Sequence, residues 1–311
     1  MKVLVTGACG YTGSVLTQKL QNLGHEVIGW DIQWFGNHIG LTDHPRDIRD
    51  PFELPDGLDA IIHLAAIAND PSVAFYPRLS WETGVLATMR LAEAAIKKGC
   101  RRFVYASSVS VYGADRGLVR EDDERHPLSD YNKTKMAAEQ VLLSYSFKLN
   151  PVIIRPATVC GLSPRMRMDL TVNMLTGQAL ADGVMTLHGG QQWRPSIHVQ
   201  DLTNLYVYLT VGHLDKHIGV FNAGFENNTL LQIAEKVQAL VGGDIKITDQ
   251  RDARSYQVNS DKLLSTGFRP EYCIDDAIVE IRDAYRAGRL ALKNPQWINL
   301  KWMEETGVKD D

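Results

Sequence analysis

Apolar residues follow two different periods along the first half of the chain. Short continuous apolar runs, typical of buried parallel strands, alternate with longer stretches in which apolar residues recur every three or four positions, as in helices. The runs that predict strands are Val3–Val5, His25–Trp30, Asp59–Leu64, Arg102–Ala106 and Val152–Arg155. Helices are predicted directly after the first run and over Leu79–Lys98 and Tyr131–Leu149. This alternation predicts an α/β fold built on a doubly wound parallel sheet.

The second half of the chain is less regular. Its periodicity predicts helices over Leu170–Leu180, Val199–Val211, Thr229–Leu240 and, as the final helix, Ile274–Arg289. Short strands are predicted over Gly183–Leu187 and Val220–Asn222. We expect one domain over residues 1–156 and a smaller lobe over 157–311, from which some segments return to the sheet. The lobe should cover the carboxyl ends of the strands, where such sheets bind their ligands.

Three glycines separate the first strand from the first helix, at Gly7, Gly10 and Gly13. Free backbone N–H groups and the helix dipole make a helix N-terminus attractive to an anion. Glycines let the backbone approach that anion closely, as a pyrophosphate requires. Spaced glycines alone are a weak signal, but their position between a strand and a helix favours a dinucleotide site.

Asp31 follows the second predicted strand, about twenty residues after the glycines, where a carboxylate can hold a ribose 2′-hydroxyl. The alternative is that Asp31 only caps a turn. Because a carboxylate would repel a 2′-phosphate, the pattern favours NAD over NADP.

Composition excludes some other partners. The chain has 311 residues, 23% charged and 44% hydrophobic, with a formal net charge of -4, so it carries no basic surplus for nucleic acid or an anionic membrane. Its four cysteines lack metal-type spacing, and no metal site is expected. Without a signal peptide or a long apolar run, a cytoplasmic location is expected.

Two groups of residues can carry chemistry. Tyr131 and Lys135 stand four positions apart, one helical turn, and an ammonium beside a phenol lowers the pKa of the phenol. Tyr131 is therefore a candidate general acid and base. Serines at the end of the strand Arg102–Ala106 could hydrogen-bond the substrate oxygen that exchanges a proton. Either group alone is weak evidence, since both patterns also occur by chance.

With these motifs in this order, the chain resembles the extended short-chain dehydrogenase/reductase family, in particular its nucleotide-sugar epimerases and dehydratases, which have a Rossmann fold and a smaller substrate lobe. The segment from Thr6 to Gly13 is similar to the family's TGxxGxxG loop, and Tyr131 with Lys135 to its YxxxK motif. The resemblance implies Ser108 as the catalytic serine, beside Tyr131 and Lys135. It also implies NAD, held by residues of the first domain: Gly7, Gly10, Tyr11, Thr12, Gly13, Asp31, Asp47, Ile48, Leu64, Ala65, Ala66, Tyr131, Lys135 and Pro156.

The second lobe extends the resemblance to a nucleotide-diphosphate sugar. The segment Trp193–Asp201 is similar to the family's RDxIHVxD segment, which implies that Arg194 binds the substrate diphosphate. The other substrate-binding residues implied are Ser108, Thr158, Arg165, Asn173 and Arg254, the last preferred over Arg251. Thr158 and Gly84 stand where the family usually has asparagines.

Departures from the family pattern narrow the chemistry. Dehydratases and related decarboxylases carry acidic residues just after the catalytic hydroxyl residue, where this chain has Val109 and Ser110. Redox chemistry at one carbon remains, either 4-epimerisation through a ketone or net oxidation or reduction by a dehydrogenase or ketoreductase. A non-catalytic NAD-binding sensor is a third reading. The sugar and the base stay open, and the resemblance implies a homodimer formed through helices 79–98 and 131–149.

Overall fold

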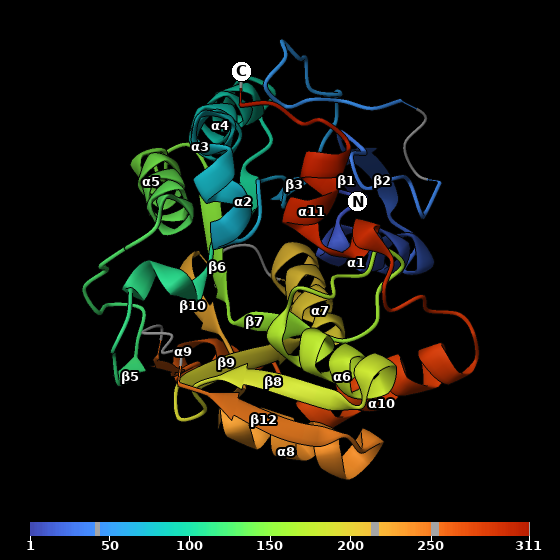
Figure 1. The fold of residues 1–311 in the computed structure, drawn as a ribbon. Coiled ribbons are helices and arrows are strands. Elements are labelled where there is room, and N and C mark those ends of the chain that lie inside the picture. Colours follow the sequence, from blue (N-terminus) through green and yellow to red (C-terminus); the bar gives the residue numbers. More distant parts are fainter. Residues whose placement is uncertain (41–43, 213–217, 250–254, 311) are drawn as a thin grey trace.

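The computed structural model describes residues 1–40, 44–212, 218–249 and 255–310 (Figure 1). A six-stranded sheet forms its centre, and every pair of neighbouring strands in it is parallel. In spatial order the strands are β10 (Gly219–Ala223), β6 (Asn150–Pro156), β4 (Arg102–Ala106), β3 (Ala60–His63), β1 (Lys2–Thr6) and β2 (Glu26–Trp30). The predicted α/β fold is confirmed.

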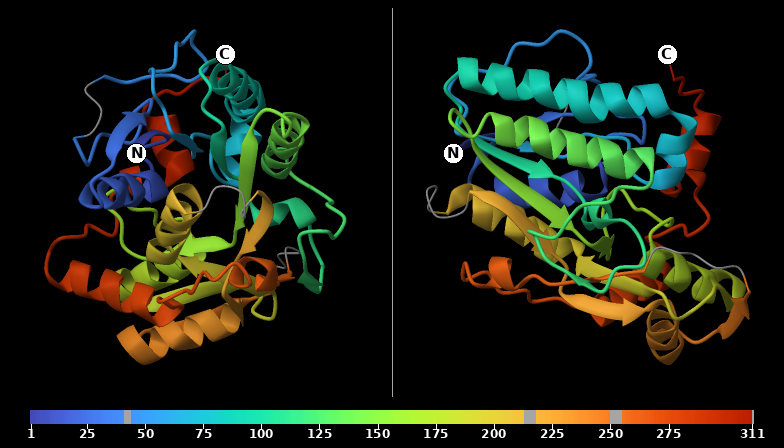
Figure 2. Two further views of the ribbon diagram at one scale, coloured as in Figure 1. Left: turned by 180° about the vertical axis from the view of Figure 1, so that it is seen from behind. Right: turned by 90° about the vertical axis from the view of Figure 1, so that its left-hand side faces the viewer.

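Helices cover both faces of this sheet. Helices α1 (Tyr11–Asn22) and α7 (Val199–Val211) pack on one face, and α4 (Ala87–Lys97) and α5 (Asp130–Ser144) pack on the other. Figure 2 shows α4 and α5 running side by side along one flank of the molecule. The sheet is therefore doubly wound, with its strands buried on both sides.

Alternation along each strand explains why both faces are apolar. Val3 and Val5 pack with α1 and α7, whereas Leu4 between them packs against the opposite layer. The same holds in β3, where Ile62 and Ile61 belong to opposite layers. Successive side chains of a strand point to opposite faces, so a continuous apolar run supplies both cores.

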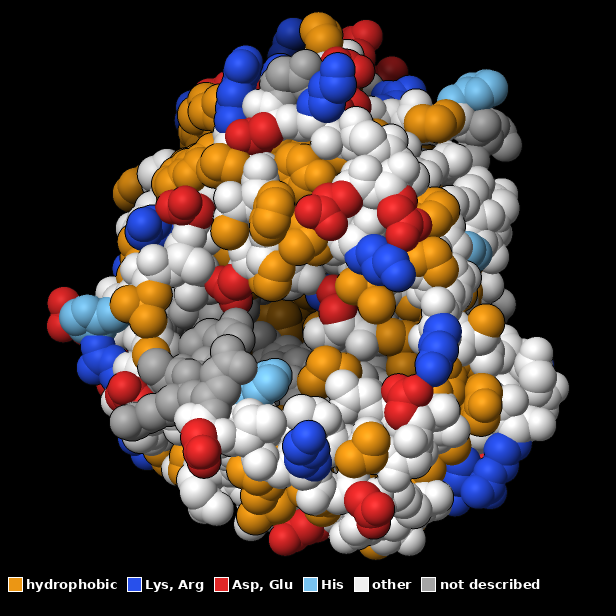
Figure 3. Space-filling model, viewed as in Figure 1, with side chains coloured by type: hydrophobic (Ala, Val, Ile, Leu, Met, Phe, Trp, Pro, Cys, Tyr) orange, Lys and Arg blue, Asp and Glu red, His pale blue; other side chains and the backbone are white. Residues whose placement is uncertain are grey.

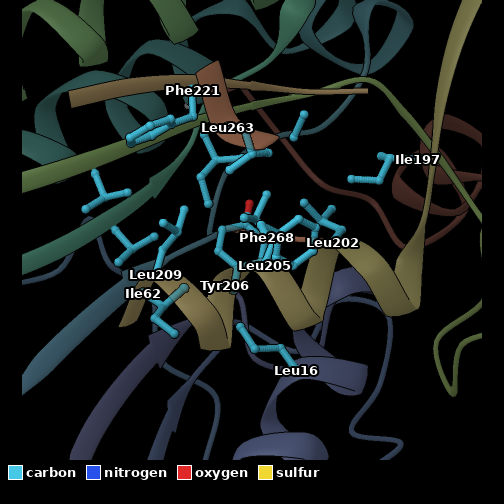
Figure 4. Close-up of a cluster of buried hydrophobic side chains, with 14 of the residues drawn as sticks. Leu16, Ile62, Ile197, Leu202, Leu205, Tyr206, Leu209, Phe221, Leu263 and Phe268 are labelled. Carbon is cyan, nitrogen blue, oxygen red and sulfur yellow. The ribbon is translucent and has the colours of Figure 1, made fainter. Parts of the chain in front are cut away.

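Helix α7 joins the sheet to the second lobe. Its residues Leu202, Leu205 and Leu209 lie in a cluster that includes Ile62 of the sheet, as Figure 4 shows. Phe268 from the later part of the chain packs in the same cluster. Both α7 and β10 come from beyond residue 156 but belong to the central layers.

The second lobe has its own small sheets and core. Strands β11 (Glu226–Thr229), β9 (Trp193–His198) and β7 (Thr158–Cys160) form one sheet, and β12 (Asp244–Thr248) pairs with β8 (Val184–His188). Helices α6 (Thr171–Asp182), α8 (Leu230–Val241) and α10 (Ile274–Arg286) bury their apolar sides together against this layer.

The remaining elements are short. Within the described residues they are α2 (Asp70–Phe75), α3 (Pro77–Trp81), a π-helical segment (Glu82–Leu86), the 3₁₀ segments Val109–Tyr112 and Pro295–Trp297, β5 (Leu118–Val119), which pairs with β13 (Gln257–Val258), α9 (Asp261–Leu264) and α11 (Asn299–Glu305).

Some sequence-based predictions need correction. The stretch Asp47–Asp50, whose Asp–x–x–Asp pattern before Pro51 predicts the start of a short helix, is a turn instead, because the Asp47 carboxylate accepts the backbone N–H of Arg49 at 2.8 Å. The predicted helix Leu79–Lys98 is interrupted by the π-helical segment. Ile274–Arg289 is not the final helix, since α11 follows it and packs back on the first domain. That contact joins residues far apart in the sequence, which local periodicity does not report.

Candidate active site

A cavity lies at the carboxyl ends of β1, β2, β3 and β4, where sheets of this type bind ligands. Figure 3 shows the molecule hollowed near the centre of this face, between the sheet and the second lobe. The structure brings all of the expected cofactor residues together around the cavity. These are Gly7, Gly10, Tyr11, Thr12, Gly13, Asp31, Asp47, Ile48, Leu64, Ala65, Ala66, Tyr131, Lys135 and Pro156.

The glycine loop requires glycines because its backbone packs closely against other backbone segments. Gly7 has φ +72°, and a Cβ on it would lie 2.8 Å from the backbone nitrogen of Ala65. A Cβ on Gly13 would lie 2.0 Å from the carbonyl oxygen of Gly7. Helix α1 has no side-chain cap at Gly10 and no acidic residue in its first turn. Its N-terminal N–H groups therefore face an opening that accepts an anion, as a pyrophosphate requires.

Asp31 is placed by the loop at the end of β2. Its carboxylate accepts N–H groups from Cys9 at 3.0 Å and Gln33 at 2.6 Å, which ties the glycine loop to β2. Burial raises the pKa of Asp31, and these two hydrogen bonds oppose that rise. The Asp47 carboxylate, at the far end of the cavity, is held by the guanidinium of Arg49 at 2.8 Å.

The expected catalytic residues also meet. Helix α5 begins at Ser129, whose hydroxyl accepts the N–H of Asn132 at 3.2 Å. This start aims Tyr131 into the cavity, and Ser108 lies close enough to its phenol to lower the pKa of the phenol. Lys135, one turn later, donates to the carbonyl oxygen of Ala106 at 2.7 Å.

The pKa values correct one expectation. The pKa of Tyr131 is raised, first because the phenol is buried and second because of the negative charge of Asp70. The Nζ atom of Lys135 lies 6.0 Å from the Tyr131 ring centre and does not bring the pKa of the phenol below its usual value. Burial also lowers the pKa of Lys135 to about 8. The predicted net lowering of the Tyr131 pKa by Lys135 is therefore wrong for this structure.

A buried ionic network supports the strand ends under the site. The guanidinium of Arg155 donates to both carboxylate oxygens of Glu139, at 2.8 and 2.7 Å. Glu139 also accepts the hydroxyl of Ser107 at 2.5 Å, next to Ser108. Arg155 donates in turn to the hydroxyl of Tyr112 at 2.6 Å. Since every member is paired, the network fixes the segment that carries Ser108 relative to α5.

The expected substrate residues are more scattered. Of those in the second lobe, Arg165 lines the cavity, whereas Thr158 and Arg194 do not. Asn173 is fully buried, and its amide bonds the N–H of Gly161, the hydroxyl of Tyr11 and the carbonyl oxygen of Arg167. These bonds give Asn173 a structural role and correct the expectation that it faces phosphates. Arg254 and Arg251 lie outside the described residues.

Further residues surround the site; the sequence points to Arg167 near the sugar, but not to the residues from the end of the chain. Arg167 also lines the cavity and lowers the pKa of Tyr131 by its charge. Its guanidinium forms two hydrogen bonds with Asp169, both at 2.9 Å. Asn299 and Met303, from the segment around α11, line the cavity as well. Nothing in the local sequence around Asn299 signals this, because its position depends on a long-range contact.

The geometry defines a class of protein. A glycine loop at a helix N-terminus, an acid after β2, and a tyrosine and a lysine one helical turn apart line one cavity, with Ser108 near the phenol of the tyrosine. This is the arrangement of a dinucleotide-dependent enzyme that moves a hydride and a proton at an alcohol carbon.

The chain belongs to the NAD dependent epimerase/dehydratase family, whose model matches residues 3–224. It is 33% identical over 273 residues to "Uncharacterized UDP-glucose epimerase YtcB" of Bacillus subtilis, covering 78% of this chain and 83% of the relative. It is 27% identical to UDP-glucuronic acid decarboxylase 1 of Xenopus tropicalis, covering 96% and 75%. The solved UDP-glucuronic acid 4-epimerase of Bacillus cereus, in complex with UDP-glucuronic acid and NAD, is 27% identical, with a TM-score of 0.80 over 92% of this chain and 99% of that one.

The predicted family and its NAD cofactor are thereby confirmed. Among the described residues, no helix is both long and apolar enough to cross a membrane. Within the same ranges, no three His, Cys, Asp or Glu side chains are grouped so as to hold a metal ion.

Proposed function

We propose that the protein is an NAD-dependent UDP-sugar 4-epimerase that keeps its cofactor through the catalytic cycle. The observation that carries this proposal is the position of Tyr131 in the cavity that holds the glycine loop, with Lys135 one helical turn away and Ser108 near its phenol. Val109 and Ser110 follow Ser108 without a carboxylate. The uridine diphosphate part rests on the relatives, which act on UDP-sugars by name.

Tyr131, Ser108 and Lys135 have different roles in the proton transfer. When bound, NAD would supply the acceptor and the donor for the hydride of the sugar C4, which is returned to the opposite face of the ring. Tyr131 takes the hydroxyl proton as that hydride leaves and gives it back in the second half of the cycle. Ser108 donates a hydrogen bond to the reacting oxygen. Lys135, held by the carbonyl oxygen of Ala106, supplies positive charge near the phenol.

The raised pKa of Tyr131 keeps its phenol protonated when no oxidised cofactor is bound. Buried, and close to the negative charge of Asp70, the phenol keeps its proton at neutral pH. The positive charge of the oxidised nicotinamide favours phenolate, as does that of Lys135. Proton removal from the sugar is therefore coupled to the presence of the oxidised cofactor.

One experiment separates this proposal from the alternative of a dehydrogenase or ketoreductase. The purified protein is denatured and the supernatant is assayed for NAD, and the native protein is incubated with UDP-sugars without added cofactor. The expected results are stoichiometric NAD and a 4-epimer seen by NMR. Cofactor-free protein that accumulates NADH on addition of NAD and substrate would instead identify the alternative, and neither reaction would support a non-catalytic sensor.

We further propose that the protein forms a homodimer through the flank of α4 and α5. Hydrophobic side chains gather over α2 to α4 in Figure 3. Within the segments from α2 to the π-helical turn before α4, Phe75, Trp81 and Leu86 are 60%, 38% and 52% exposed. An apolar surface of this kind favours association. Light scattering should give twice the chain mass, and Leu86→Glu should give the mass of one chain; a wild-type monomer would contradict the dimer.

A cytoplasmic location belongs to the same proposal. All four cysteines, Cys9, Cys100, Cys160 and Cys273, are free thiols, and three of them are buried. Free thiols are usual in a reducing compartment. Fractionation of cells that express the chain should recover it with cytoplasmic markers, and recovery from the extracellular medium would contradict this location.

A further inference from the structure

Arg165 is a buried cation that faces the cavity from the second lobe. Only 2% of the residue is exposed, and it lines the same cavity as the glycine loop. Its guanidinium lies over the ring of Phe35, 4.0 Å from the ring centre, and Nη2 donates to the amide oxygen of Asn299 at 2.5 Å. Both contacts fix the direction of the guanidinium without neutralising its charge.

The charge of Arg165 has no direct counterion in the described parts of the chain. None of the carboxylates there lies within 4.0 Å of its nitrogens, and its buried Nε has no hydrogen-bond partner among the described residues. Burial and the neighbouring charge of Arg167 lower the pKa of Arg165 to about 9. A buried and incompletely paired cation is unfavourable by itself, so such a site is completed by an anion.

The loop that carries Arg165 is fastened to the start of α1. Ser163 donates its hydroxyl to the carbonyl oxygen of Tyr11 at 2.7 Å, and its Oγ lies 3.0 Å from that of Ser14. Tyr11 donates its own hydroxyl to the carbonyl oxygen of Gly161 at 2.7 Å. The second lobe thus bears directly on the helix N-terminus, which has neither a side-chain cap nor an acidic first turn.

We propose that Arg165 binds the diphosphate of the bound dinucleotide from the side opposite the glycine loop. The diphosphate would then lie between the N–H groups of α1 and the guanidinium, which can donate two parallel hydrogen bonds to phosphate oxygens. This inference rests on the proposed function, because it takes NAD as the resident cofactor. It moves Arg165 from the substrate, where the resemblance had assigned it, to the cofactor.

Neighbouring residues favour the cofactor over the substrate diphosphate. Arg165 packs on Phe35, which follows β2 on the ribose side of the cavity. Its charge is attracted first by Asp169 and then by Asp31, which also follows β2. The arginine whose charge acts on Tyr131 is Arg167 and not Arg165. Arg165 is therefore associated with the dinucleotide end of the cavity and not with the reacting sugar.

Asn299 acts as a positioning residue for this contact. Besides accepting from Arg165, its amide nitrogen donates to the carbonyl oxygen of Ala68, after β3, at 3.3 Å. The start of α11 therefore sets where the guanidinium points. An anionic side chain at this position would compete with the diphosphate for Arg165.

The test compares Arg165→Met with the wild type in calorimetric binding of ADP, adenosine and UDP to cofactor-free protein. Met keeps the length of the side chain but removes its charge and donors. We expect ADP to bind about 10- to 100-fold more weakly, the effect of losing charge-assisted hydrogen bonds. Adenosine and UDP should bind as they do to the wild type.

Arg46→Met is the matched control, because Arg46 also lines the cavity but stacks on Trp30, 4.4 Å from the ring centre. Its substitution should weaken ADP and adenosine by the same factor. The proposal is overturned if Arg165→Met weakens UDP and spares ADP, if it weakens ADP and adenosine equally, or if it changes nothing. Failure of the proposed function would show differently, as a wild-type protein that does not bind ADP.

Variants at Asn299 test the positioning role. Asn299→Ala should weaken ADP by less than Arg165→Met, because the guanidinium stays in the cavity but is less well oriented. Asn299→Asp keeps the shape and the acceptor yet supplies a competing anion, so it should weaken ADP more than Asn299→Ala. The reverse order of these two variants would contradict an anion-binding Arg165.

Discussion

The strand ends of the first domain and the segment around α11 border the same cavity by different means. In the first domain the glycine loop, Asp31 and Ser108 each follow a strand at once, so short stretches of sequence position them. Asn299 and Met303 reach the cavity only because the chain returns to the first domain after α10. The residues that carry the chemistry are thus positioned by local motifs, whereas the enclosure of the cavity depends on long-range contacts. Mutations can therefore affect one without affecting the other.

The return of the chain is held by a few specific contacts. Trp302 donates its indole N–H to the carbonyl oxygen of Trp34 at 2.7 Å, and Gln296 donates to that of Phe35 at 2.9 Å. Met303 packs with Ile67 and Tyr76 in a separate apolar cluster. These hydrogen bonds join the loop after β2 to the segment around α11, across the cofactor cavity.

Removing the Tyr131 hydroxyl should have the largest effect on activity. Tyr131→Phe should lower kcat by about a thousandfold, the usual contribution of a general acid or base. Binding of NAD, measured by calorimetry, should change little because the ring stays in place. Lys133→Met on the exposed side of the same helix is the control and should keep full activity. Normal turnover by Tyr131→Phe would exclude the proposed proton transfer.

Breaking the buried ion pair of Glu139 and Arg155 tests whether this network stabilises the strand ends that carry the catalytic motifs. Glu139→Gln removes the charge that pairs with Arg155, which is 2% exposed, and should lower the free energy of unfolding by about 3 to 5 kcal/mol. Denaturant unfolding measures this loss. Glu53→Gln at an ion pair on the surface should change stability by less than about 1 kcal/mol. Equal effects of the two variants would show that the network carries no special stability.

The sequence allowed much of the first domain to be predicted. It allowed little prediction of the side of the cavity formed by the second lobe and the segment around α11. Val3–Val5, Asp31, Tyr131 and Lys135 are placed by periodicity and by motifs of a few residues, and the structure brings them together. Asn173 shows the limit of assigning a residue's role from a family motif, because its amide is occupied by hydrogen bonds inside the lobe. The directions of such side chains depend on packing between distant segments, which spacing along the chain does not encode.

The next largest effect is expected on the selectivity of the first domain for NAD over NADP. Asp31→Ala should weaken NAD about tenfold and leave NADP unchanged or bound more tightly, because a repelling carboxylate is removed. Asp31→Asn keeps an acceptor for the N–H groups of Cys9 and Gln33 and should improve NADP relative to NAD. Equal losses for both cofactors in both variants would contradict the assignment of Asp31 to the ribose.

The smallest effect concerns the returning segment. Trp302→Phe removes the hydrogen bond to Trp34 and should lower the free energy of unfolding by about 1 kcal/mol, measured with denaturant. Trp297→Phe is a matched control, since the buried Nε1 of Trp297 has no hydrogen-bond partner among the described residues. It should be the milder substitution. A larger loss for Trp297→Phe would mean that ring packing, not the hydrogen bond, holds the segment.

The return of α11 to the first domain also affects the order in which the molecule can fold. Translation delivers β1, α1 and β2 early, and these elements can pair as soon as they leave the ribosome. Asn299 and Met303 are delivered long afterwards, and their contacts with the first domain close a very long loop. Completion of the cavity is therefore a late step in biogenesis, and newly made protein gains its full cofactor enclosure only after both lobes have folded.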